Sequence, residues 1–142
     1  MLVLNDKIKA EIFSHAELEY PNECCGILLG IRSGERRNAK RVIRTENRCN
    51  SDKAVHFAVD PLELLSAENI AEKDGLEIIG FYHSHPDHKA VISQTDALYM
   101  IPGNSYPIVS VISGTAANFA SFEKLTEKNS GSGEPIITES EK

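Results

Sequence analysis

The sequence lacks the features that mark membrane-spanning, secreted and nucleic-acid-binding proteins. It has no apolar run that approaches the roughly 20 residues needed to span a bilayer. Charged residues follow Met1 too soon for a secretory leader. Lys and Arg total 15 against 21 Asp and Glu, a net charge of −6, whereas phosphate backbones and anionic bilayers attract clustered basic side chains. We therefore expect a cytoplasmic protein with neither a nucleic-acid nor a membrane partner.

Cysteine is also scarce. Of the three residues, Cys24 and Cys25 are adjacent and Cys49 stands alone, so there is no Cys-x-x-Cys pair for a structural zinc site or a redox centre. An odd number leaves at least one thiol outside any intramolecular disulfide. We interpret all three as small apolar side chains in a reducing compartment.

The length of 142 residues leaves no room for two well-filled cores. A composition of 41% hydrophobic and 25% charged residues is typical of a globular protein. The composition changes once, at Thr126, beyond which Ser, Gly, Glu and Lys dominate. We therefore expect one domain over residues 1–125 and a flexible polar tail over residues 126–142.

Apolar periodicity and capping residues predict two long helices and one short helix. The first begins at a cap provided by Asn5 or Asp6. The second has Asp60 as its N-cap, followed directly by proline, and ends at Gly75. The third covers residues 93–100.

The strands are predicted from short apolar or alternating runs bounded by turn residues. They cover residues 25–31, 41–45, 55–59, 76–82, 108–112 and 118–122. Because many of them are joined by short turns, we expect an α+β domain. Its mixed, largely antiparallel and curved sheet is packed by the two longer helices.

One stretch carries most of the chemical information. His83 and His85 are two residues apart at the end of a predicted strand, so their side chains point to the same face and can share a metal ion. Asp96 falls in the first turn of the next helix, where its carboxylate can face back toward the strand end. Two histidines, one aspartate and one water match the ligand set of a catalytic zinc ion.

A hydrolytic zinc site also needs a group that accepts a proton and passes it to the leaving amine. Glu23 is a candidate because it directly precedes the apolar run 24–29, at the mouth of a core strand. Its distance of 60 residues from His83 in the sequence leaves open whether the two meet.

These residues together resemble the JAMM (MPN-domain) zinc metalloprotease family. Its pattern is an upstream Glu, then His-x-His-Pro, five residues, and Pro-Ser-x-x-Asp. Glu23, the run His83-Ser84-His85-Pro86, Ser93 and Asp96 stand at that spacing, and the likeness extends over residues 1–125. Ile92 is the one departure, since it replaces the usual proline.

The resemblance implies a fold and a role for each matching residue. It implies a JAMM/MPN-like fold with the short helix at the metal site. One Zn²⁺ per chain is bound by His83, His85 and Asp96. Glu23 is the general base toward the metal-activated water and then protonates the leaving amine. Ser93 donates to the oxyanion.

The small single-domain prokaryotic members of the family imply the substrate. On this reading the protein is a peptidase or isopeptidase that hydrolyses the amide bond after the C-terminal Gly-Gly of a ubiquitin-like sulfur-carrier protein. Phe57, Ser84 and His88 are the expected substrate contacts, and the segments 47–53 and 87–92 flank the site. The sequence is equally compatible with a monomer and a homodimer.

Three alternatives stay open at this point. The chain could be a non-catalytic MPN-like module that binds ubiquitin-like proteins, or a metallohydrolase of general small peptides. A nucleophilic pair of histidine with Cys24 or Cys25 is a third mechanism. It leaves the second histidine and Asp96 without a role.

Overall fold

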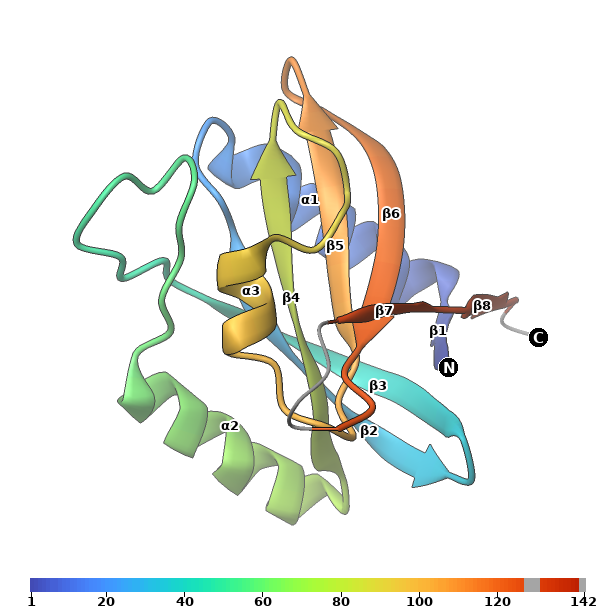
Figure 1. Cartoon of the computed structure of the whole chain (residues 1–142). Helices are drawn as coiled ribbons and strands as arrows, with labels where there is room; N and C mark the ends of the chain where they lie inside the picture. Colours follow the sequence, from blue (N-terminus) through green and yellow to red (C-terminus); the bar gives the residue numbers. More distant parts are fainter. Residues whose placement is uncertain (127–130, 141–142) are drawn as a thin grey trace.

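The computed structural model describes residues 1–126 and 131–140, which form three helices and one eight-stranded sheet (Figure 1). The helices are α1 (Asp6–Glu19), α2 (Pro61–Asp74) and α3 (Gln94–Leu98). The strands are β1 (Leu2–Asn5), β2 (Cys25–Ser33), β3 (Arg36–Thr45), β4 (Glu77–Pro86), β5 (Tyr106–Ile112), β6 (Thr115–Glu123), β7 (Ser132–Glu134) and β8 (Ile136–Glu139). None of the helices in these two ranges is long and apolar enough to cross a membrane.

The sheet is mixed and mostly antiparallel, as the sequence predicts. Its strand order is β7-β6-β5-β4-β2-β3-β1-β8. Strand β4 lies between β2, which is antiparallel to it, and β5, which is parallel to it. Strand β1 runs parallel to both of its neighbours, β3 and β8. The central position of β4 matters because this strand carries both histidines of the motif.

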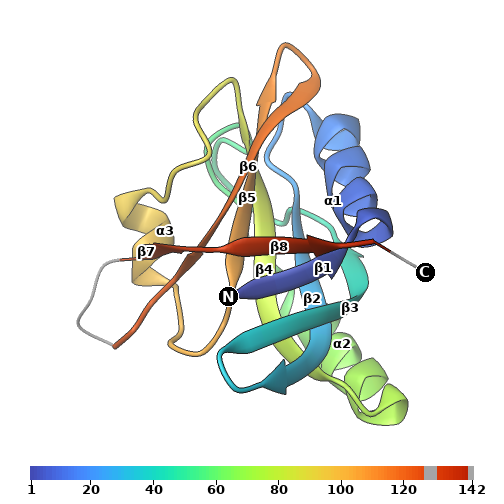
Figure 2. The ribbon, with the colours of Figure 1, turned by 90° about the vertical axis from the view of Figure 1, so that its right-hand side faces the viewer.

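The expectation of a flexible tail is wrong for residues 132–139, while residues 127–130 and 141–142 lie outside the described part. Only Pro135 separates β7 from β8, yet β7 pairs with β6 and β8 pairs with β1, at opposite ends of the strand order. The sheet therefore curls until its two edges meet on this segment (Figure 2). Composition fails to predict this because the strands pair through main-chain groups, which polar residues also carry.

Helix α1 packs on one face of the sheet. The Asn5 side chain caps it by accepting a 2.8 Å hydrogen bond from the backbone N–H of Ile8. The helix buries a stripe at four-residue spacing, consisting of Ile8, Ile12 and Ala16. The largest partner on the sheet is Tyr82, which is fully buried and whose hydroxyl lies 2.7 Å from Nδ1 of His15.

Helix α2 packs on the opposite face against Ile27 and Leu29 of β2. It begins at Asp60, whose side chain accepts from the N–H of Leu62, and ends at Gly75 in the left-handed conformation, as predicted. The two helices thus cover the two faces of the central strands, and neighbouring apolar residues of β4 divide between the two cores (Figure 1).

Near the site and at the N-terminus, the predicted strands differ from the structure. Residues 55–59 form no strand, because the C=O of His56 and the N–H of Ala58 bond to the side chain of Asn47. Strand β1 is absent from the sequence prediction, since four residues are too few for a pattern and its partners are distant in the chain.

Candidate active site

Strand β4 presents the two histidines on one face. Tyr82 belongs to the core under α1, whereas Phe81 packs in the core under α2. Because side chains alternate along a strand, His83 and His85 follow Phe81 onto the α2 face. Both imidazoles are buried, and their Nε2 atoms lie 3.1 Å apart. The strand continues beyond the predicted range 76–82 and ends at Pro86.

Helix α3 brings the carboxylate of Asp96 to the histidines. Ser93 is its N-cap: the Ser93 Oγ accepts from the N–H of Asp96, and the N–H of Ser93 donates to Asp96 Oδ2. This reciprocal capping fixes the carboxylate, and the same Oδ2 atom lies 3.1 Å from His83 Nε2 and 3.2 Å from His85 Nε2. Three potential ligand atoms thus form a nearly equilateral triangle.

The triangle fits a tetrahedral metal ion. Zinc bonds of about 2.0–2.1 Å at tetrahedral angles place neighbouring ligand atoms about 3.3 Å apart, close to the 3.1–3.2 Å between these three atoms. The other ring nitrogen of His85, Nδ1, donates a 2.8 Å hydrogen bond to the carbonyl of Lys89. In the neutral ring this bond holds the proton on Nδ1, so that the lone pair of Nε2 faces the triangle, which is the form that a metal ligand requires.

Glu23 joins this cluster from the segment just before β2. Its carboxyl group offers an oxygen within 4.8 Å of ligand atoms of His83 and His85. The side chain is buried, and Oε1 has no hydrogen-bond partner among residues 1–126 and 131–140. Such an orphaned buried oxygen is costly unless a further polar group meets it. The tertiary structure therefore brings together the four side chains that the sequence separates by up to 73 positions.

The carboxyl groups of Glu23 and Asp96 differ in pKa. Burial raises the pKa of Glu23 to about 8. Burial also opposes ionisation of Asp96, but the hydrogen bonds from His83 and His85 outweigh it and hold the pKa of Asp96 well below its usual range. Near neutral pH one carboxyl is therefore an anion and the other can hold a proton, which is a division typical of acid–base sites.

The two imidazoles also differ. Burial lowers the pKa of His83. It acts in the same direction on His85, where the hydrogen bonds to Asp96 and to the Lys89 carbonyl outweigh it and raise the pKa. A metal ion binds the deprotonated imidazole, so the ion competes with a proton chiefly at His85.

Comparison with known families agrees with the motif. Residues 5–124 match the profile of the family described as prokaryotic homologs of the JAB domain. The chain belongs to this family. The match places it in the JAB/MPN-like group that the sequence pattern predicts.

The curated relatives of this JAB-domain protein include a desampylase and a conjugate cleaving protease. A desampylase of Pyrococcus furiosus is 36% identical over 118 residues, which cover 82% of this chain and 76% of that protein. A probable TtuB-protein conjugate cleaving protease of Thermus thermophilus is 37% identical over 86 residues. That match covers 61% of this chain and 54% of that protein, so the chain spans about half of the Thermus protein.

Solved structures share the fold. The solution structure of a protein from Desulfitobacterium hafniense is 36% identical, with a TM-score of 0.85 over 99% of this chain and 94% of that one. A second, from Salinibacter ruber, is 29% identical, with a TM-score of 0.75 over 96% and 90% of the two chains. The mixed α+β architecture is thus that of JAB-like domains.

The three expected substrate contacts lie in different surroundings. The ring of Phe57 stacks on His83 with centroids 4.6 Å apart, and the exposed His88 has its ring centroid 5.8 Å from that of His85. Ser84 is fully buried, and its hydroxyl accepts from the N–H of Cys24. Strand alternation turns the Ser84 side chain away from the histidine face.

Two side chains that bond to the backbone near the site, those of Asn47 and Ser110, were not identified from the sequence. Asn47 is buried and bonds to the backbone around Glu23 and Phe57, and Ser110 bonds to the carbonyl of His88. The only sequence signal for Asn47 was its place in the segment 47–53, which was expected to flank the site. Burial of a polar residue after a strand has no signature in a single sequence.

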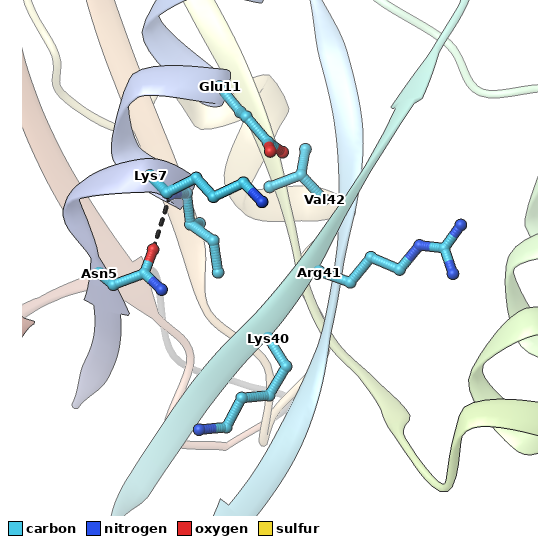
Figure 3. Close-up of a pocket in the computed structure, with 7 residues that line it drawn as sticks. Asn5, Lys7, Glu11, Lys40, Arg41 and Val42 are labelled. Atoms are coloured by element: carbon cyan, nitrogen blue, oxygen red, sulfur yellow. Dashed lines mark hydrogen bonds between the residues drawn. The ribbon is translucent and has the colours of Figure 1, made fainter. Parts of the chain in front are cut away.

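A separate hollow lies between α1 and β3, with a volume of about 230 Å³ and lining residues that include Lys7, Lys40 and Arg41 (Figure 3). The side chains of Lys40 and Arg41 point away from one another in Figure 3, so the basic groups do not converge on a ligand. No side chain of the histidine cluster lines this hollow. The hollow is thus separate from the candidate active site.

Proposed function

We propose that this protein is a zinc-dependent isopeptidase. It hydrolyses the amide bond that follows the C-terminal Gly-Gly of a ubiquitin-like sulfur-carrier protein. The observation that carries the proposal is the triangle of His83, His85 and Asp96 with the buried carboxyl of Glu23 beside it. The relatives named desampylase and conjugate cleaving protease support a substrate that is a protein conjugate.

His83, His85 and Asp96 would hold the metal ion. Asp96 rather than Glu23 is proposed as the third ligand, because its oxygen lies 3.1–3.2 Å from both Nε2 atoms. When bound, zinc polarises the scissile carbonyl group and lowers the pKa of a water molecule to about 7.

Glu23 and Ser93 are proposed to transfer the proton and to stabilise the developing negative charge. Glu23 takes a proton from the attacking water and returns it to the leaving amine, a cycle that suits a carboxyl whose pKa is raised to about 8. The Ser93 oxygen already accepts from the Asp96 N–H, and its side chain is exposed, so its O–H is available to donate to the developing oxyanion.

The decisive experiment uses a ubiquitin-like carrier whose Gly-Gly is followed by a further residue or by an isopeptide-linked lysine. The zinc-loaded protein is expected to release a carrier that ends at Gly-Gly, as read by intact-mass spectrometry. A stable complex without any change in mass supports a binding module and overturns the proposal. Equal rates on short Gly-Gly peptides without a folded carrier indicate a general peptide hydrolase.

Glu23→Gln tests the role of the base. Turnover is expected to fall by about 10²–10⁴-fold while the zinc content stays near one per chain, because the change removes a proton acceptor and no metal ligand. Glu139→Gln is the matched control, since Glu139 lies on β8 and pairs with the exposed Arg36. Wild-type turnover in Glu23→Gln contradicts the mechanism.

A further inference from the structure

Asn47 lies just after β3 and uses its whole side-chain amide inside the protein. Its Nδ2 donates to the carbonyl of Glu23 at 3.0 Å and to that of His56 at 2.9 Å. Its Oδ1 accepts from the N–H of Cys49 at 3.0 Å and from that of Ala58 at 3.2 Å. Two donors and two lone pairs are the full capacity of an amide, and the side chain is buried.

The orientation of this amide follows from its partners. Turning the group over would set its N–H donors against two backbone N–H groups and its oxygen against two carbonyl oxygens. Aspartate, which has the same shape, provides no donor for the carbonyls of Glu23 and His56. Asparagine therefore satisfies all four partners at position 47, whereas the nearly isosteric aspartate does not.

Three of the four bonds join two further segments, which reach the metal triangle from outside β4 and α3. One segment carries Glu23, which precedes β2 and whose N–H donates to the carbonyl of Lys53 at 2.7 Å. The other carries Phe57, which stacks on His83 and whose neighbours on both sides bond to Asn47. Both backbone polar groups of Glu23 therefore bond to the segment 47–53, and one of these bonds is made by the Asn47 amide.

On its C-terminal side Glu23 is followed by Cys24, which bonds to Ser84 of β4, so the support on its other side comes from the segment 47–53. Glu23 itself stands outside β2, and its Oε1 atom has no hydrogen-bond partner within the described ranges. The place of the carboxyl group is thus set by its main chain. A displacement of about 1 Å is enough to cost a positioned acid–base group much of its effect.

We propose that Asn47 is a positioning residue, which holds the carboxyl of Glu23 and the ring of Phe57 at the metal-binding face through their backbones. The inference rests on the proposed function for its catalytic consequence. It makes a separate structural claim, which is that loss of the two amide donors loosens the backbone at Glu23.

Asn47→Asp is the test variant, and Asn38→Asp is the matched control. Asn38 also donates its amide to a backbone carbonyl, that of Ile31, but lies on β3. In zinc-loaded Asn47→Asp, kcat is expected to fall at least about tenfold with KM within about twofold. The thermal midpoint of each sample shows whether the variant is folded, and the zinc content shows whether it carries the metal. Asn38→Asp is expected to keep kcat within about twofold of wild type.

Hydrogen exchange provides a readout that is independent of turnover. The N–H of Glu23 is expected to exchange at least about tenfold faster in Asn47→Asp and at the wild-type rate in Asn38→Asp. Should Asn47→Asp fail to fold, Asn47→Ser, which retains one donor, takes its place in both measurements. A folded variant with wild-type kcat and wild-type exchange at Glu23 overturns the inference. An inactive wild-type enzyme overturns the proposed function instead and leaves the exchange comparison to decide the role of Asn47.

Discussion

The hydroxyl of Tyr20 donates a 2.5 Å hydrogen bond to Oδ2 of Asp87. Tyr20 ends α1, three residues before Glu23, and Asp87 directly follows the strand that carries both histidines. The other oxygen of Asp87 accepts from the N–H of Ser113 in the turn between β5 and β6. Asp87 also adopts a positive φ of 53°, so this residue redirects the chain into the segment 87–92. The pair connects the chain just before Glu23 to the end of the strand that carries both histidines.

Tyr20→Phe is expected to lower kcat by about twofold to fivefold, because the segments of Glu23 and His85 lose a direct connection while every reactive group stays present. Backbone order parameters over residues 87–92 are expected to fall in the variant. Tyr99→Phe is a suitable control, since its side chain is highly exposed. Unchanged kcat and order parameters in Tyr20→Phe speak against the connection.

Asp96→Asn is expected to weaken zinc binding by at least about 100-fold and to abolish turnover. The change keeps the size of the side chain but removes the negative charge that faces both imidazoles. Competition with a chelator measures the affinity, and elemental analysis measures the content. Asp74→Asn, which alters an exposed ion pair with Arg41, is expected to retain wild-type zinc. Full zinc affinity in Asp96→Asn assigns the third ligand to another residue, with Glu23 first in line.

His15 is expected to make the fold sensitive to acid. Burial, with a smaller contribution from Arg44, lowers the pKa of His15 from 6.5 to about 4. At a pH between about 4 and 6.5, His15 therefore carries a proton in the unfolded chain but not in the folded protein. The free energy of unfolding falls as the pH drops through this window, by about 3 kcal/mol for this group.

The variant His15→Gln is expected to lose that part of the pH dependence in urea titrations between pH 7 and pH 4. His56→Gln, at an exposed position, is expected to keep the wild-type slope. A slope that persists in His15→Gln assigns the acid sensitivity to other groups.

Glu134→Ala is expected to lower the free energy of unfolding by about 3 kcal/mol, which is the low end of the cost of breaking a buried pair. The fully buried carboxylate of Glu134 pairs with Arg37 at 2.8 Å and accepts from the hydroxyl of Ser121. Arg37 then keeps a longer ion pair with Glu123, at 3.3 Å, and its hydrogen bonds to Gly103 and Ser105.

The matched control for Glu134 is Glu139→Ala on the adjacent strand. Glu139 and Arg36 are both exposed, so this change is expected to cost no more than about 1 kcal/mol. Denaturant titrations compare the two. Equal effects contradict a specific role of the buried carboxylate in holding the segment that joins the two sheet edges.

The sequence determined the local elements and the chemical identity of the site. The caps at Asn5 and Asp60 and the apolar runs of β2 and β4 act over a few residues, so their pattern can be read without a partner. The spacing of His83, His85 and Asp96 also acts locally, since one strand end and one helix start place all three. The predicted convergence of these side chains agrees with the structure.

Only the tertiary structure decided how distant segments meet. Glu23 reaches the histidines because β2 pairs with β4 in the register that sets Cys25 beside His83. Asn47 bonds to Glu23 and to the segment around Phe57, and β7 and β8 close the sheet although their composition is that of a polar tail. These contacts join residues far apart in the chain through main-chain groups. The side-chain pattern of a single sequence does not encode such partners.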